Sequence, residues 1–162
     1  MSAPQIDYPP GDHSRIKRSP LRAHYDRETV HAILDAGLLC HVDYVIDGQP
    51  YVTPTAYWRK GERVYWQGSS ASKMLRHLKT GPRVCFIVSL MDGLVLARSG
   101  FHTSVNYRSV MALGAAELVA GETEKLAALE DMMERIVPGR WPELKPPTRQ
   151  ELKATIVVSL QL

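Results

Sequence analysis

The sequence predicts an α+β fold that is mainly antiparallel β, with six or seven strands and a few peripheral helices. Three observations support this prediction: several segments alternate with period two, tight turns separate them, and only one long segment has clear helical periodicity. Consecutive strands joined by tight turns pair antiparallel rather than parallel. A sheet of this size is expected to close into a barrel, because closure leaves no bare edges.

The chain is predicted to hold one domain. Its 162 residues are enough for a single core. Residues 1–23 contain four prolines and a basic run, which favours an N-terminal arm followed by one domain over residues 24–162. The net charge of +3 is too small to favour nucleic acid as the main ligand, but it suits a small anion. No signal peptide or apolar stretch of membrane-spanning length stands out, so a cytoplasmic protein without membrane contact is expected.

The first elements follow from local signals. Asp26 is a good N-cap for a helix that Gly37 ends. From residue 38 the period becomes two, and Asp47-Gly48 predicts a two-residue hairpin turn between strands 38–46 and 49–58. Residues 63–67 then form a third strand.

The remaining elements are predicted in the same way. We expect a short helix over 74–79 and a long amphipathic helix over 123–137. Asp92-Gly93 predicts a turn, and Gly114 a bend or bulge within a strand over 107–119. The other predicted elements are strands 83–90, 94–99 and 155–160 and a short helix over 149–153. Both cysteines, Cys40 and Cys85, lie in apolar runs and are expected to be free thiols.

Three stretches have the composition of a binding site. The loop that ends in Lys73 combines a glycine, three serines and a lysine, which suits a phosphate; an ordinary serine N-cap with a solvated lysine is the alternative. Pro54 interrupts a strand of hydroxyl and aromatic residues, which suits a flat heterocycle or, alternatively, a simple edge strand. Arg108 lies mid-strand in an apolar region, so it should face an anion, either a carboxylate or a phosphate.

Other signals are weaker. No catalytic triad, carboxylate pair or metal motif stands out among the residues. His102 is a minor candidate because its loop lies between two strands that could flank a pocket. The basic cluster that a nucleic-acid-binding dimer would need is confined to the arm.

The chain resembles the pyridoxamine-5'-phosphate-oxidase-like flavin proteins in three segments that follow one another in the family's order. These segments are VTPTAYW, VYWQGSSASKMLRHL and VNYRSVMALGAAELV. The branch that contains the Nim-type nitroimidazole-resistance proteins is the most similar, and VPGRW with ELKAT also matches it. The resemblance covers roughly residues 25–160 and implies the FMN-binding split β-barrel. It also implies a homodimer with cofactor sites at the interface. The residues that it assigns to the cofactor site are Thr53, Pro54, Thr55, Tyr57, Ser69, Ser70, Ser72, Lys73, Tyr107, Arg108 and Ser109.

Two departures from the family pattern bear on function. Trp66 stands where Nim-type proteins have a histidine, which argues against nitroimidazole reduction. Residues 155–162 contain no basic residue, which argues against oxidation of vitamin B6 phosphates. The resemblance then implies an FMN-dependent oxidoreductase acting on a small-molecule substrate. A non-catalytic carrier or sensor of flavin or haem is the alternative, and FAD, deazaflavin or haem are alternative cofactors.

Overall fold

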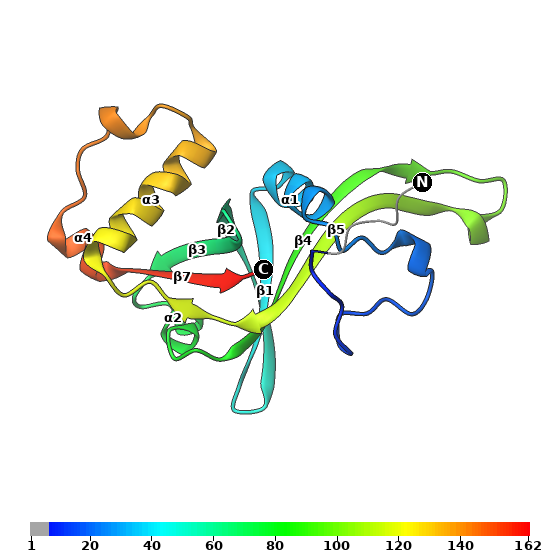
Figure 1. Cartoon of the computed structure of the whole chain (residues 1–162), viewed down its shortest axis with the longest axis horizontal. Coiled ribbons are helices and arrows are strands. Elements are labelled where there is room, and N and C mark those ends of the chain that lie inside the picture. The colour runs from blue at the N-terminus through cyan, green and yellow to red at the C-terminus, as the bar shows by residue number, and fades with distance from the viewer. Residues whose placement is uncertain (1–6) are drawn as a thin grey trace.

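The computed structural model describes residues 7–162, and one antiparallel sheet of seven strands dominates this part of the chain (Figure 1). Neighbouring strands follow the order β5-β4-β1-β2-β3-β7-β6. The strands are β1 (Leu39–Ile46), β2 (Gln49–Lys60), β3 (Arg63–Ser69), β4 (Arg83–Val95), β5 (Ser104–Ala115), β6 (Glu117–Leu118) and β7 (Thr155–Gln161). The predicted fold class is therefore confirmed.

Four α-helices and three short 3-10 helices surround the sheet in the described residues. The α-helices are α1 (Arg27–Ala36), α2 (Lys73–Leu78), α3 (Glu122–Ile136) and α4 (Arg149–Ala154). The 3-10 helices are η1 (Pro20–Arg22), η2 (Gly100–His102) and η3 (Trp141–Glu143). The predicted cap of α1 is confirmed, because the Asp26 side chain accepts a hydrogen bond of 2.8 Å from the Thr29 backbone N–H.

The sheet curls until strands from its two ends meet, which gives a half-barrel. Gly114 of β5 marks the contact: a Cβ built there would lie 2.6 Å from Leu160 Cδ1 of β7. A side chain at this position would force the two strands apart. The predicted continuous strand over 107–119 is wrong, because Ala116 interrupts it between β5 and β6. Gly114 is needed for the close approach and is not a bulge.

The inner face of the curled sheet forms the main core. α1 contributes Ile33 and Leu34 to this core, and α2 contributes Met74, Leu75 and Leu78. Alternate residues of the strands complete it, including Val42, Trp66, Phe86 and Val158, all of them 0 % exposed. Because side chains alternate along a strand, the residues between these point to the outer face of the sheet.

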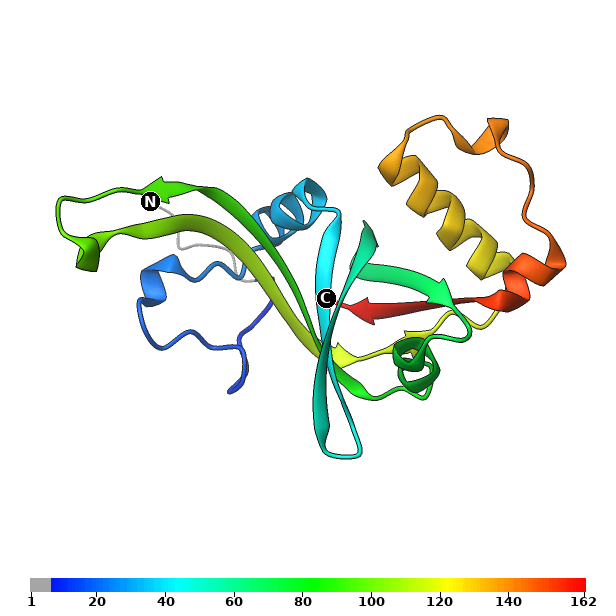
Figure 2. The same cartoon turned by 180° about the vertical axis from the view of Figure 1, so that it is seen from behind.

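The outer face has a covered and an uncovered region, as Figures 1 and 2 show. α3 lies over the end of β2 and over β3 and β7, where Trp58, Ala128 and Val157 form a second buried cluster. The outer face of β1, β4, β5 and the first part of β2 has no helix of this kind over it. Beyond the body, β4 and β5 continue as a long two-stranded hairpin that ends at η2.

The predicted turn at Asp92-Gly93 is wrong. β4 runs through this position to Val95, with a bulge between Met91 and Gly93. A two-residue hairpin turn needs positive φ angles, and Asp47 and Gly48 have them, at 52° and 79°. Asp92 and Gly93 keep negative or extended φ because β5 continues to pair with β4 on both sides of the bulge.

The part of the predicted arm that the structure describes folds back against the chain. The Tyr8 hydroxyl donates a hydrogen bond of 2.6 Å to Glu62 and contacts His31 Nε2 at 2.9 Å. The backbone N–H groups of Asp7 and Tyr8 donate to the Tyr25 carbonyl, at 3.0 and 2.9 Å. Residues 1–6 of the predicted arm lie outside the described residues.

Candidate functional site

The predicted phosphate loop connects β3 to α2. The Ser72 hydroxyl accepts a hydrogen bond of 3.4 Å from the Leu75 backbone N–H and so caps α2. The Ser69 hydroxyl accepts one of 3.1 Å from the Ala71 N–H. The serine N-cap, which was the alternative to a phosphate-binding loop, is therefore present at Ser72. Ser70 is half-buried, and within residues 7–162 its hydroxyl has no hydrogen-bond partner, although its backbone N–H donates to the Ala154 carbonyl at 2.7 Å.

Lys73 does not extend into open solvent but turns towards the β1–β2 hairpin. Its ammonium donates a hydrogen bond of 2.9 Å to the Tyr51 hydroxyl and lies 4.4 Å from the centroid of that ring. This hydrogen bond raises the pKa of Lys73, so the side chain stays cationic at neutral pH. Lys73 forms no ion pair with any described residue, and its charge is available to an anionic ligand.

Two tyrosines connect this lysine to the second predicted stretch. The rings of Tyr51 and Tyr44 stack with centroids 5.6 Å apart at 14°. The Tyr44 hydroxyl shares a hydrogen bond of 3.1 Å with Thr53 Oγ1. The structure thus brings Thr53 and Lys73, which come from different predicted stretches, to one connected polar surface, which we call the tyrosine network.

The other residues of the β2 stretch divide between the two sheet faces. Tyr57 lies in the core, where its hydroxyl donates a hydrogen bond of 2.6 Å to the Leu34 carbonyl, and burial raises its pKa. Thr55 is half-buried on the same face as Thr53. Pro54 is exposed on the opposite face and pairs with His41 on one side only, because β3 joins β2 from Tyr57 onward. Pro54 therefore lies where β2 has a neighbouring strand on one side only, which agrees with the edge-strand alternative.

The third stretch lies apart from the other two within this chain. Tyr107, Arg108 and Ser109 pair with β4 in the projecting hairpin, beyond the residues of β4 that pair with β1. The Arg108 side chain is 51 % exposed in this chain. Its guanidinium donates hydrogen bonds of 2.8–3.2 Å to the Asp92 carboxylate. Of the two anions expected opposite Arg108, a carboxylate or a phosphate, the carboxylate is present in this chain. The longer hairpin provides this partner, because the bulge places Asp92 beside Arg108.

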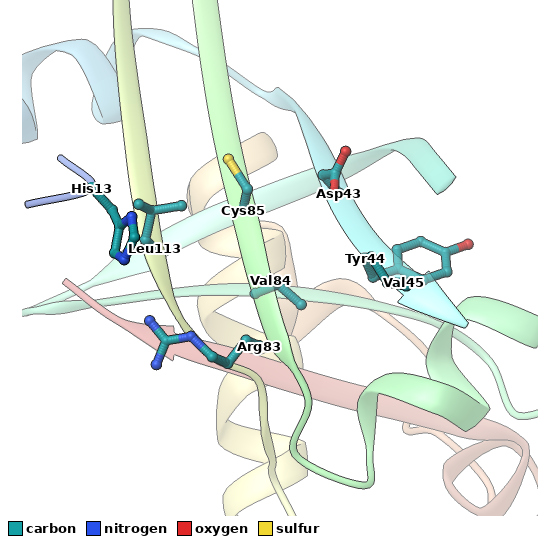
Figure 3. A pocket seen from close by; sticks show the side chains of 8 residues that line it. All are labelled: His13, Asp43, Tyr44, Val45, Arg83, Val84, Cys85 and Leu113. Atoms are coloured by element: carbon teal, nitrogen blue, oxygen red, sulfur yellow. The ribbon is translucent and has the colours of Figure 1, made fainter. Parts of the chain in front are cut away.

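A cavity with a volume of about 630 Å³ lies on the other side of the sheet (Figure 3). Its lining consists of His13, Asp43, Tyr44, Val45, Arg83, Val84, Cys85 and Leu113. Burial raises the pKa of the Cys85 thiol, with a smaller contribution from the Asp43 carboxylate, so the thiol stays protonated at neutral pH. Both cysteines are free, as predicted, although Cys85 is only half-buried.

Several of these residues were not predicted from the sequence. Tyr44 and Tyr51 could have been found, because a two-residue turn at Asp47-Gly48 fixes them as directly opposite partners. No local signal brings His13 and Arg83 together, since they meet only through tertiary structure. His102 lies at the tip of the projecting hairpin, against the Phe101 ring, and lines neither cavity described in residues 7–162.

Two further observations limit the chemistry of residues 7–162. Among them, no three His, Cys, Asp or Glu side chains gather closely enough to hold a metal ion by themselves. No helix in the same range is long and apolar enough to cross a membrane.

Comparisons with known proteins agree with this architecture. The profile of the Pyridoxamine 5'-phosphate oxidase family matches residues 26–162. The flavocytochrome Anf3 from Azotobacter vinelandii is 46 % identical, with a TM-score of 0.89 over 95 % of this chain and 72 % of its own. The FAD and heme binding protein from Mycobacterium smegmatis is 37 % identical, with a TM-score of 0.80 over 84 % of this chain and 66 % of its own. No curated protein matches the chain.

A curled antiparallel half-barrel with these helices defines the split-barrel class of proteins. Since the family profile covers most of the sequence, the chain belongs to the pyridoxamine 5'-phosphate oxidase family. A putative 5-nitroimidazole antibiotic resistance protein from Bacteroides thetaiotaomicron is 20 % identical, with a TM-score of 0.67 over 85 % of this chain and 80 % of its own. That similarity supports the fold alone, and both flavin-associated structures are more similar to this chain.

Proposed function

We propose that this chain is a flavin- and haem-binding electron-transfer protein, with FAD in place of the FMN that the sequence suggested. The observation that carries the proposal is its 46 % identity to a flavocytochrome over 95 % of the chain. A second structure, 37 % identical, is described as binding FAD and heme. These relatives favour the carrier of flavin or haem, which was the alternative from the sequence, over an FMN-dependent oxidoreductase.

The tyrosine network and the loop beside it would hold the phosphate end of the flavin. Lys73 supplies a cation that has no ion-pair partner among residues 7–162, and the Ser70 hydroxyl, without a hydrogen-bond partner in the same range, supplies a donor. Tyr51 fixes the ammonium of Lys73 in place, which lowers the entropy lost when an anion binds. The Thr53 and Thr55 hydroxyls lie along the same face of β2 and would border the ring system. When bound, flavin and haem together allow two-electron and one-electron transfer.

A homodimer is part of this proposal. The outward residues of β1, β2, β4 and β5 form what we call the bare face: Leu39, Val52, Met91, Tyr107 and Met111. They are 47–72 % exposed, although apolar patches of this extent are uncommon on monomers. A second copy would cover the bare face through a twofold contact. The projecting hairpin could then bring Tyr107, Arg108 and Ser109 to the cofactor site of the partner.

Cofactor extraction tests the proposal. The protein is purified without added cofactor, and acid extraction with chromatography identifies any FAD, FMN or haem that it releases. Empty protein is then titrated separately with FAD, FMN and hemin. We expect both FAD and hemin to bind at one per chain, with FAD tighter than FMN. Binding of FMN alone would support the simpler oxidoreductase, and binding of neither flavin nor hemin would contradict the proposal.

A further inference from the structure

The cavity of about 630 Å³ on the outer side of the sheet shares Tyr44 with the tyrosine network, but its other lining residues lie outside that network, so it needs its own explanation. Its floor is a row of paired residues from three neighbouring strands: Asp43 of β1 pairs with Cys85 of β4, which pairs with Leu113 of β5. Residues that pair directly across strands point to the same face. The floor is therefore part of the outer surface of the sheet, beside the bare face.

The N-terminal arm supplies one wall, and the fold holds His13 of this arm in place. The Ser14 and Arg15 backbone N–H groups donate to the Gly11 carbonyl at 3.3 and 3.0 Å, which closes a turn around His13. The Tyr25 hydroxyl ties down the end of this turn, because it accepts from the Ile16 N–H at 3.0 Å and donates to the Ser14 carbonyl at 3.2 Å. The backbone of His13 is thus fixed on both sides.

Two polar side chains of the lining lack partners. Neither the His13 imidazole nor the Arg83 guanidinium has a hydrogen bond or an ion pair with any residue in 7–162. In Figure 3 both side chains lie on the same side of β4, and Asp43 lies on the other side. An imidazole and a guanidinium that face one cavity without protein partners are suited to a ligand that has a metal and a carboxylate.

Haem meets these requirements. Imidazole is a common axial ligand of haem iron, and arginine pairs with carboxylates such as the propionates. Val45 and Leu113 provide apolar surface for the macrocycle, and pockets of several hundred Å³ hold ligands of this size. Cys85 is a weaker candidate for the iron ligand because it is half-buried in the middle of a strand, whereas the imidazole of His13 is exposed on the wall.

We propose that this cavity is the haem site, in which the imidazole of His13 binds the iron and the guanidinium of Arg83 pairs with a propionate. The assignment rests on the proposed function, which includes haem but does not place it. Tyr25 is a positioning residue in this account, since it fixes the turn that presents His13. The haem and flavin sites then lie on opposite faces of the same sheet.

Hemin titration of the full chain tests the assignment by its spectrum. We compare the wild type with His13→Gly, Cys85→Ser and Arg83→Gln, and use His102→Ala as the matched control, since His102 is also exposed and lines no part of this cavity. We expect His13→Gly to lose the nitrogen-ligated Soret spectrum, with added imidazole restoring it, while Cys85→Ser and His102→Ala keep it. Arg83→Gln should keep the wild-type spectrum but weaken hemin binding about tenfold. Thermal melting and FAD binding confirm that each variant is folded.

The outcomes separate the two proposals. If the wild type binds hemin and His13→Gly keeps its spectrum, the assignment to this cavity is overturned and the proposed function stands. A spectrum lost in Cys85→Ser or His102→Ala instead would also overturn it. If the wild type binds FAD but no hemin, both this assignment and the haem part of the proposed function fail, and the flavin part remains.

Discussion

The outer face of the sheet has two regions with similar chemistry and different surroundings. Over the end of β2 and over β7, α3 buries Trp58 and Val157 to 1 % and 0 % exposure. On the bare face, Val52 and Tyr107 remain 60 % and 63 % exposed. Both regions are rich in apolar side chains, so the difference lies in what covers them. The chain covers one region with its own helix and leaves the other for a second copy.

The covered region is held by polar as well as apolar contacts. The Lys125 ammonium donates hydrogen bonds to the carbonyls of Leu152 and Thr155, at 3.1 and 2.9 Å. The ammonium of Lys60 pairs with the Asp131 carboxylate at 2.5 Å. These contacts attach α3 to β2, β7 and α4, so the covered region should contribute to the stability of each single chain. The bare face should instead contribute to association.

The largest expected effect is on the covered region. Trp58→Ala removes the largest side chain under α3 and should lower the free energy of unfolding by about 3–5 kcal/mol. The control, Phe101→Ala, removes an aromatic ring that is 92 % exposed at the hairpin tip and should change it by less than about 0.5 kcal/mol. Urea unfolding measures both. Similar losses in the two variants would contradict the distinction between covered and exposed aromatic residues.

The next effect should appear in association and not in folding. Val52→Asp places a charge in the bare face and should weaken the dimer by about 2–3 kcal/mol, because the carboxylate would be buried without a partner. Leu21→Asp is the matched control, since Leu21 is 96 % exposed in η1 and outside the bare face. Light scattering over a dilution series measures the dimer. A wild type that is monomeric at every concentration would refute the predicted interface.

A smaller effect is expected at the tyrosine network. Lys73→Ala should weaken FAD binding by about 1–2 kcal/mol, because a charge-assisted hydrogen bond to phosphate is lost. Lys79→Ala changes an exposed lysine at the other end of α2 and should leave the affinity unchanged. Flavin fluorescence follows both titrations. Equal affinities for the wild type and Lys73→Ala would remove Lys73 from the site.

The smallest effect at neutral pH concerns a buried thiol. Burial raises the pKa of Cys40 from its usual value near 9 to about 12. The folded state therefore favours the neutral thiol, and the stabilisation is fully present below pH 9 and is lost as the pH rises towards 12. Thiol modification at pH 8 should be slow at Cys40 and faster at the half-buried Cys85. Mass spectrometry of the modified protein distinguishes the two positions, and preferential labelling of Cys40 would contradict this.

Much of the fold could be predicted because the signals are local. The Asp47-Gly48 turn fixes a whole hairpin, and the Asp26 cap fixes the start of α1. The same dipeptide at Asp92-Gly93 did not form the predicted turn. There β4 continues in pairing with β5, and Arg108 binds the Asp92 carboxylate. Pairing with a distant strand outweighed the local turn preference, and no short window of sequence contains that information.

The site could be predicted only in part for the same reason. The composition of the loop before α2 identified Lys73, but its contact with Tyr51 depends on how the hairpin folds over α2. His13 and Arg83 are separated along the chain by α1, three strands and α2, and only the returning arm brings both to one cavity. Arg108 was expected to face an anion, but that its partner is Asp92 depends on the bulge in the projecting hairpin, which the sequence does not indicate.

Anaerobic reductive titration of the cofactor-loaded protein is the most direct measurement of the central claim, that one chain holds both a flavin and a haem. A flavin accepts two electrons and a haem iron accepts one, so we predict that about three electrons per chain are taken up, with flavin and haem bands changing in the same sample. Uptake of about two electrons per chain, with no change in any haem band, would contradict the claim.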